Sequence, residues 1–121
     1  MFLQLSHTKL DVFQASRFLC LECYRITKTF PADEIFAIVQ EIRRAALSVH
    51  LNIAEGSSRK SPAERKRFYE ISRGSVIEID TAMDIAVELM YGNSEFFSPL
   101  GERLVNTFKQ LSALINYQVK S

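Results

Sequence analysis

Apolar residues return every three or four positions throughout this chain, and few glycines or prolines interrupt them. The first run holds Val12, Ala15, Leu19, Cys23 and Ile26. Steps of three and four place such residues on one side of an α-helix, whereas a half-buried strand would alternate at every second residue. No segment shows that alternation, and 4 glycines and 3 prolines among 121 residues leave room for few turns. The sequence therefore predicts a few long helices.

Turn signals separate four such runs. Phe30-Pro31 ends the first, because a residue before proline is pushed out of the helical conformation. Gly56 falls where the second pattern stops, and a glycine after a helix can adopt the left-handed conformation without steric cost. Ser61-Pro62-Ala63-Glu64 has the order of a capping box, and Tyr91-Gly92-Asn93 ends the third run. We expect helices over about residues 8–29, 33–56, 62–91 and 98–119.

The length and the short connections define the architecture. A chain of 121 residues can bury one continuous core, so residues 1–121 are expected to form a single domain. Short loops make consecutive helices antiparallel neighbours. The predicted fold class is all-α, an antiparallel up-down-up-down four-helix bundle. The first helix carries a second apolar stripe with Leu10, Phe13, Leu21 and Tyr24, which indicates either a central position or a contact in an oligomer.

Positive charge is concentrated in the middle of the sequence. Residues 41–75 carry eight basic and four acidic side chains, while residues 76–121 carry three and six, within a total net charge of +1. Such a surplus permits contact with a phosphate backbone without requiring it. Phe68 fits the core stripe of the third helix, which leaves Tyr69 free to stack on a base. The candidate nucleic-acid-binding residues are Arg59, Lys60, Arg65, Lys66, Arg67 and Arg73.

A second group of polar residues lies beside the apolar stripes of the second and third helices. This predicted structural polar network comprises Ser48, Asn52, Glu55, Ser75 and Glu78. Gly74 lies among them, and a glycine inside a helix costs about 0.5–1 kcal/mol relative to alanine, which close approach of the second helix would offset. We expect Asn52 and Glu55 to reach Ser75 and fix the register of the two helices. A ligand or partner site, or solvent exposure, are the alternatives.

Catalytic and metal-binding patterns are missing from the sequence. Neither His7 nor His50 follows a glutamate by three residues, as a di-metal bundle requires. No nucleophile-elbow, phosphate-loop or zinc pattern occurs. Cys20 and Cys23 share one helix face and read as buried apolar thiols, with a redox or metal role as the alternative. We expect no enzyme, no catalytic residue, no metal and no cofactor, and we place His50 at the surface or in an interface.

The chain is also expected to stay in the cytoplasm. Its first residues lack a basic region followed by a sustained apolar stretch, which a secretory signal needs. No apolar run approaches the roughly 18 residues of a membrane span. A soluble protein without a membrane partner follows.

Several words of the sequence carry a family resemblance. They are Arg43-Arg44-Ala45-Ala46-Leu47-Ser48-Val49, Asn52-Ile53-Ala54-Glu55-Gly56, Arg59, Phe68, Gly74-Ser75 and Glu78. Over roughly residues 8–118 the chain resembles the bacterial four-helix-bundle proteins encoded within intervening sequences of 23S ribosomal RNA genes. The resemblance implies a helical bundle that assembles with itself into a ring, a homopentamer, and has no catalytic activity.

The same family is similar to the accessory protein of diversity-generating retroelements, a basic pentameric barrel that binds nucleic acid and a reverse transcriptase. This chain departs from both patterns: Glu41 stands where many relatives have glutamine, and the net charge of +1 is far lower than that of the accessory proteins. Two functions remain open. One is an oligomer that contacts RNA, a ribonucleoprotein or a nucleic-acid-processing protein. The other is a protein-interaction ring without nucleic-acid binding.

Overall fold

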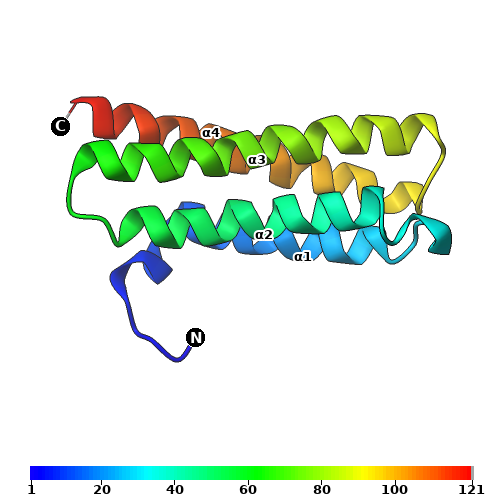
Figure 1. Ribbon diagram of the computed structural model, residues 1–121, viewed down its shortest axis with the longest axis horizontal. Coiled ribbons are helices and arrows are strands. Elements are labelled where there is room, and N and C mark those ends of the chain that lie inside the picture. Colours follow the sequence, from blue (N-terminus) through cyan, green and yellow to red (C-terminus); the bar gives the residue numbers. More distant parts are fainter. Residues whose placement is uncertain (121) are drawn as a thin grey trace.

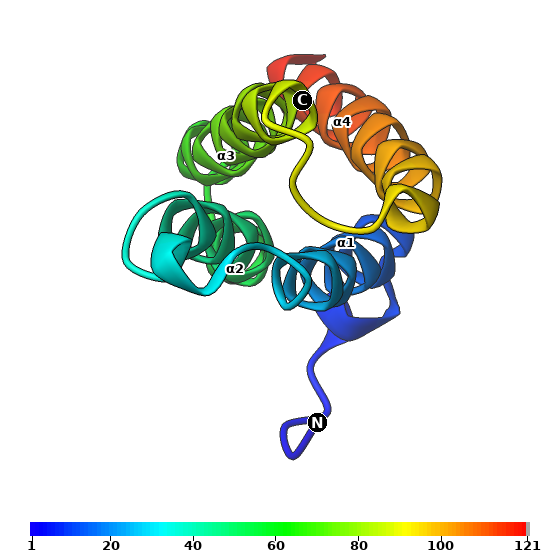
Figure 2. The same ribbon diagram turned by 90° about the vertical axis from the view of Figure 1, so that its right-hand side faces the viewer.

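Four helices stand at the corners of a square bundle in the computed structural model, which describes residues 1–120. They are α1 (Asp11–Thr27), α2 (Ile38–Ser57), α3 (Pro62–Glu88) and α4 (Phe97–Lys120), and each runs antiparallel to the next (Figure 1). Each helix packs against the next in sequence, and α1 also packs against α4. Figure 2 looks down the bundle and shows α1 diagonally opposite α3. Residues 1–120 contain no strand, so the predicted all-α four-helix bundle is confirmed.

Three short 3-10 turns precede or join the helices: η1 (Ser6–Lys9), η2 (Ala32–Glu34) and η3 (Ser94–Phe96). The second helix begins at Ile38, later than the expected residue 33, because the backbone at Ala37 leaves the helical region (φ −123°, ψ −110°). The three-four spacing of Val39 and Ile42 also predicts Ile35 or Phe36 in the core stripe of the second helix. They are 50% and 88% exposed, so that prediction is wrong.

The core receives side chains from all four helices, among them Leu19, Ile26, Ile42, Ile79 and Leu111, none of them measurably exposed. Burial of one such side chain stabilises a fold by about 1.5–3 kcal/mol. Cys20 and Cys23 are free thiols within this core. Burial raises the pKa of both, so neither is poised as a thiolate.

Gly56 differs from its sequence-based role. It lies inside α2 and lacks a positive φ, so the prediction of a left-handed residue after the helix is wrong. A side chain at this position would meet α3 instead: an added Cβ would lie 2.9 Å from Phe68 Cβ and from Tyr69 Cε1. The glycine therefore permits close packing of α2 and α3 just before the turn that joins them.

The turn between α2 and α3 lies at the same end of the bundle as both termini (Figure 1). At the opposite end, the α3–α4 connection carries two left-handed residues, Met90 (φ 59°) and Gly92 (φ 77°). The predicted stop at Tyr91-Gly92-Asn93 thus lies just beyond the end of α3.

Candidate nucleic-acid interface

The α2–α3 turn is closed by a helix cap. Ser61 is the N-cap residue of α3, and its Oγ accepts a 3.1 Å hydrogen bond from the backbone N–H of Glu64. Pro62 is the first helical residue, where its missing N–H costs nothing. The cap fixes the start of the helix that carries most of the candidate basic residues.

Tyr69 and Phe68 exchange the roles that the sequence predicts for them. Tyr69 is 2% exposed, and its hydroxyl lies 2.9 Å from Ser57 Oγ. Phe68 is only half-buried. The prediction that Tyr69 is available for base stacking is therefore wrong, since its ring fills the space beside Gly56. A seven-residue step back from Val76, which lies in the buried stripe, would have identified Tyr69 as the core residue.

Phe68 is flanked by two guanidinium groups. Arg59 lies 4.8 Å and Arg67 lies 5.7 Å from the centre of its ring. Arg59 also forms an ion pair with Glu55 one turn earlier on α2, and its buried Nε has no hydrogen-bond partner among residues 1–119. Such an aromatic ring between arginines combines a stacking surface with positive charge.

Two other candidate arginines hold helices together. Arg65 Nε donates to Gln118 Oε1 at 2.8 Å, and the same guanidinium donates to the carbonyls of Arg59 and Lys60. Arg73 donates to Ser112 Oγ at 3.1 Å and lies over the ring of Phe108. Their donors are partly used within the chain, which reduces what remains for a ligand.

The ammonium groups of Lys60 and Lys66 remain available to solvent or a partner. Within residues 1–120, neither ammonium group has an ion pair or a hydrogen bond. Lys60 is exposed in the turn and Lys66 is half-buried on the first turns of α3. We call Lys60, Lys66 and the exposed Arg67 the accessible basic edge.

The fold separates charge along the length of the bundle. The half that contains the α2–α3 turn comprises residues 1–17, 48–75 and 109–119 and has nine basic and four acidic side chains, a net charge of +5. The other half comprises residues 18–47 and 76–108 and has five basic and ten acidic side chains, a net charge of −5. The small total charge therefore conceals two strongly different ends. A field of this kind orients a charged partner as it approaches.

The predicted polar network is assembled in part. Ser75 Oγ donates to Ser48 Oγ at 2.8 Å, and Asn52 Nδ2 donates to the Ser48 carbonyl at 2.8 Å and to Ser48 Oγ at 3.1 Å. Beside it, the buried Ser72 donates to the Val49 carbonyl at 2.7 Å. The Ser75 and Ser72 bonds link α3 to α2 and fix their register, whereas Asn52 bonds within α2 to Ser48 and not directly to Ser75 as expected. The predicted network does not include Ser72. Its position within the apolar stripe of the third helix is the feature of the sequence that indicates a buried hydroxyl group.

Glu55 and Glu78 lie outside that chain of hydrogen bonds. Both are exposed, and they pair with Arg59 and with Arg44 (2.6 Å) respectively. Nothing lies within 4 Å of a Cβ built on Gly74, so the expected approach of α2 at this position is also wrong. The physical reason is that Gly74 lies on an exposed part of α3.

His50 lies in the seam between α1 and α2 and is half-buried, so it is more enclosed than the surface position that the sequence offers as one alternative. Its Nδ1 lies 2.6 Å from Oγ of the buried Ser16, and its ring lies 4.3 Å from that of Phe13. Burial lowers the pKa of His50, assisted by the nearby positive charges of Arg17 and His7. In the sequence, the position of His50 four residues after the buried Ala46 is the signal that its side chain turns toward the core.

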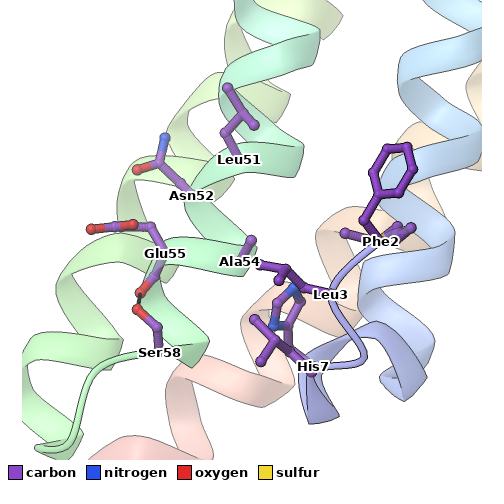
Figure 3. Close-up of a pocket in the computed structure, with 10 residues that line it drawn as sticks. Phe2, Leu3, His7, Leu51, Asn52, Ala54, Glu55 and Ser58 are labelled. Atoms are coloured by element: carbon purple, nitrogen blue, oxygen red, sulfur yellow. Dashed lines mark hydrogen bonds between the residues drawn. The ribbon is translucent and has the colours of Figure 1, made fainter.

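A groove of about 840 Å³ lies between the N-terminal segment and α2 (Figure 3). Phe2, Leu3 and His7 approach from one side, while Leu51 and Asn52 line the other. The lining is mainly apolar, so it does not extend the basic surface.

No group of three or more potential metal ligands lies together within residues 1–120. None of the described helices is both long and apolar enough to span a membrane.

Comparisons with known proteins agree with this geometry. The model of the 23S rRNA-intervening sequence protein family matches residues 8–113. The fold is similar to the crystal structure of a protein of unknown function from the S23 ribosomal protein family of Bacteroides thetaiotaomicron VPI-5482. The TM-score is 0.76 and the identity 18%, over 86% of this chain and 97% of that one. No curated protein matches the sequence. Because the family model spans most of a helical bundle with the expected motifs, the chain belongs to the 23S rRNA-intervening sequence protein family.

Proposed function

We propose that this chain is a non-enzymatic, cytoplasmic homo-oligomer that contacts RNA or a ribonucleoprotein through the basic half of the bundle. The observation that carries the proposal is the charge separation, which collects a net +5 around the α2–α3 turn. Phosphate contacts supply most of the sequence-independent affinity for nucleic acid. A basic surface that is confined to one end suits a partner that approaches along the bundle axis.

Within that half, the side chains divide by their availability. The accessible basic edge, Lys60, Lys66 and Arg67, offers charge for phosphate contacts, while Phe68 between two guanidinium groups offers a surface on which a base can stack. Arg65 and Arg73 act mainly by holding α3 against α4. We assign binding to the first group and positioning to the second. The assembly of five copies follows from the family resemblance.

A fluorescence-anisotropy titration with a structured RNA tests the proposal. Wild-type affinity is expected to fall as salt rises, because bound counterions are released from the phosphates. Replacing Lys66→Glu together with Arg67→Glu should weaken binding and reduce the salt slope by about one for each lost phosphate contact. The matched control, Arg44→Glu with Arg103→Glu, makes the same change of charge in the acidic half. No binding at low salt, or equal loss in both variants, would contradict the proposal.

A protein-interaction ring without nucleic-acid binding is the second candidate. The internal contacts of Arg65 and Arg73 favour it, since part of the basic surface is already used within the chain. Both candidates predict that the chain assembles with itself, and light scattering tests that prediction. Species that are multiples of 13.9 kDa support assembly, and a lone monomer contradicts both candidates.

A further inference from the structure

An outward-facing strip of α3 combines apolar and acidic residues that have no partner within the bundle. We call it the α3 outer face and define it as Ile77, Asp80, Thr81, Asp84, Ile85 and Glu88. Ile77 and Ile85 are each 52% exposed. Asp80, Asp84 and Glu88 follow one another at steps of four, an arrangement that destabilises an isolated helix. Residues 1–119 provide no ion pair for these three carboxylates.

An outward-facing strip of α1 has the opposite charge. The α1 outer face comprises Arg17, Phe18, Leu21 and Arg25, all exposed. Phe18 and Leu21 are 40% and 46% exposed, with the Arg103 guanidinium 4.8 Å from the centre of the Phe18 ring. Arg17 has no ion pair among the described residues, and Arg25 pairs only with Glu22 of its own helix. Of these four residues, only Leu21 also belongs to the second apolar stripe predicted for the first helix, since Phe13 of that stripe is buried.

The two outer faces lie on opposite sides of the molecule and run in the same direction. Because α1 and α3 occupy diagonal corners and both are followed by an antiparallel helix, they are parallel to each other (Figures 1 and 2). Both faces lie mainly in the half of the bundle with net charge −5. Two copies placed side by side with parallel long axes would therefore bring Arg17 and Arg25 near the acidic residues of α3.

We propose that the α1 outer face of one copy packs against the α3 outer face of the next, head to tail. This inference rests on the proposed homo-oligomer and names its interface. A two-fold contact of either face with itself would oppose like charges, which selects against a symmetric dimer. A head-to-tail contact uses both faces of every copy and closes into a ring when the rotation between copies permits.

The surface beside α3 has room for the apolar residues of α1. A groove of about 360 Å³ between α3 and α4 is lined by Ile77, Val105 and Phe108, together with the charged residues Asp80 and Lys109. Phe18 and Leu21 supply side chains of matching character, and the arginines on either side face Asp80 and Asp84. Interfaces of this kind take their affinity from the apolar centre and their orientation from the surrounding charges.

Charge reversal on the full chain tests the interface, with molar mass measured by light scattering. Reversal on one face, either Asp80→Arg with Asp84→Arg or Arg17→Glu with Arg25→Glu, should convert the assembly to the 13.9 kDa monomer. The four substitutions combined restore opposite charges and should restore the assembly. Glu95→Arg with Glu102→Arg is the control for the α3 reversal, because it makes the same change of charge outside both faces. Circular dichroism checks that every variant remains helical.

The outcomes separate this inference from the proposal on which it rests. A monomeric wild type overturns both the assembly and its interface. A wild-type assembly that survives reversal of either face overturns the α1–α3 contact and leaves the homo-oligomer standing. Loss of assembly in the control variant to the same extent also overturns the contact, since net charge alone would then explain the result. Rescue by the fourfold variant supports it, because only a contact between the two faces predicts rescue.

Discussion

Gly56 and Gly74 lie in the two helices of the same hairpin, yet their surroundings are opposite. A Cβ on Gly56 would press against Phe68 and Tyr69 at 2.9 Å, whereas a Cβ on Gly74 would meet nothing within 4 Å. Both residues interrupt an otherwise regular helical pattern, and the sequence offers no means to tell them apart. The difference shows that a glycine inside a helix indicates close packing only where the neighbouring helix actually faces it.

The largest effect should come from Gly56→Ala. The new methyl group would overpack the contact with Phe68 and Tyr69, which typically costs about 1–3 kcal/mol and outweighs the gain in helix propensity. Urea denaturation should show a lower midpoint with an unchanged slope. An unchanged or higher free energy of unfolding would mean that the two helices can move apart without cost.

A smaller loss is expected from Tyr69→Phe, which keeps the buried ring and removes its hydroxyl. The lost hydrogen bond to Ser57 should lower the free energy of unfolding by about 0.5–1.5 kcal/mol. Ser57→Ala is the matched variant, and the double variant should cost less than the sum of the two single ones because the residues share one bond. Additive effects would show that the bond between Tyr69 and Ser57 contributes nothing to stability. They would also weaken the contrast between the packed surroundings of Gly56 and the open surroundings of Gly74.

The smallest effect, of opposite sign, is predicted for Gly74→Ala. Alanine fits the open position and raises helix propensity, so the free energy of unfolding should increase by about 0.5–1 kcal/mol. The measurement belongs in the Arg17→Glu, Arg25→Glu background, in which the proposed contact with a neighbouring copy is removed. Destabilisation there would show that Gly74 is required within the single chain, and the two glycines would no longer differ.

Much of the fold was predictable because its signals are local. The three-four spacing of Val12, Ala15, Leu19 and Ile26 predicts a buried helix face, and all four are buried. Likewise Ser61 caps α3 as its sequence context indicates. One error concerns which of two neighbouring residues turns inward: Tyr69, rather than the predicted Phe68, is buried in the core. A shift of one position rotates a side chain by about 100° on a helix, which weak amphipathicity near the helix ends does not resolve.

The candidate site was predictable in composition and less so in availability. The sequence identifies six basic residues around the α2–α3 turn as candidates. Only the folded chain separates Arg65 and Arg73, whose guanidinium groups bond to α4, from Lys60 and Lys66, which have no such partner within residues 1–120. The residues that make the difference, Gln118 and Ser112, lie far away in sequence, and no local pattern connects them.

The sequence by itself determined four helices, their order and the buried stripe that holds them together, because helix periodicity and capping depend on residues only a few positions apart. The tertiary structure decided how charge is distributed. It brings residues 1–17, 48–75 and 109–119 together into a half with net charge +5, opposite a half with net charge −5, in a chain whose total is only +1. Electrostatic potential sums over distances in space, and antiparallel helices place residues that are far apart in sequence at the same end of the molecule.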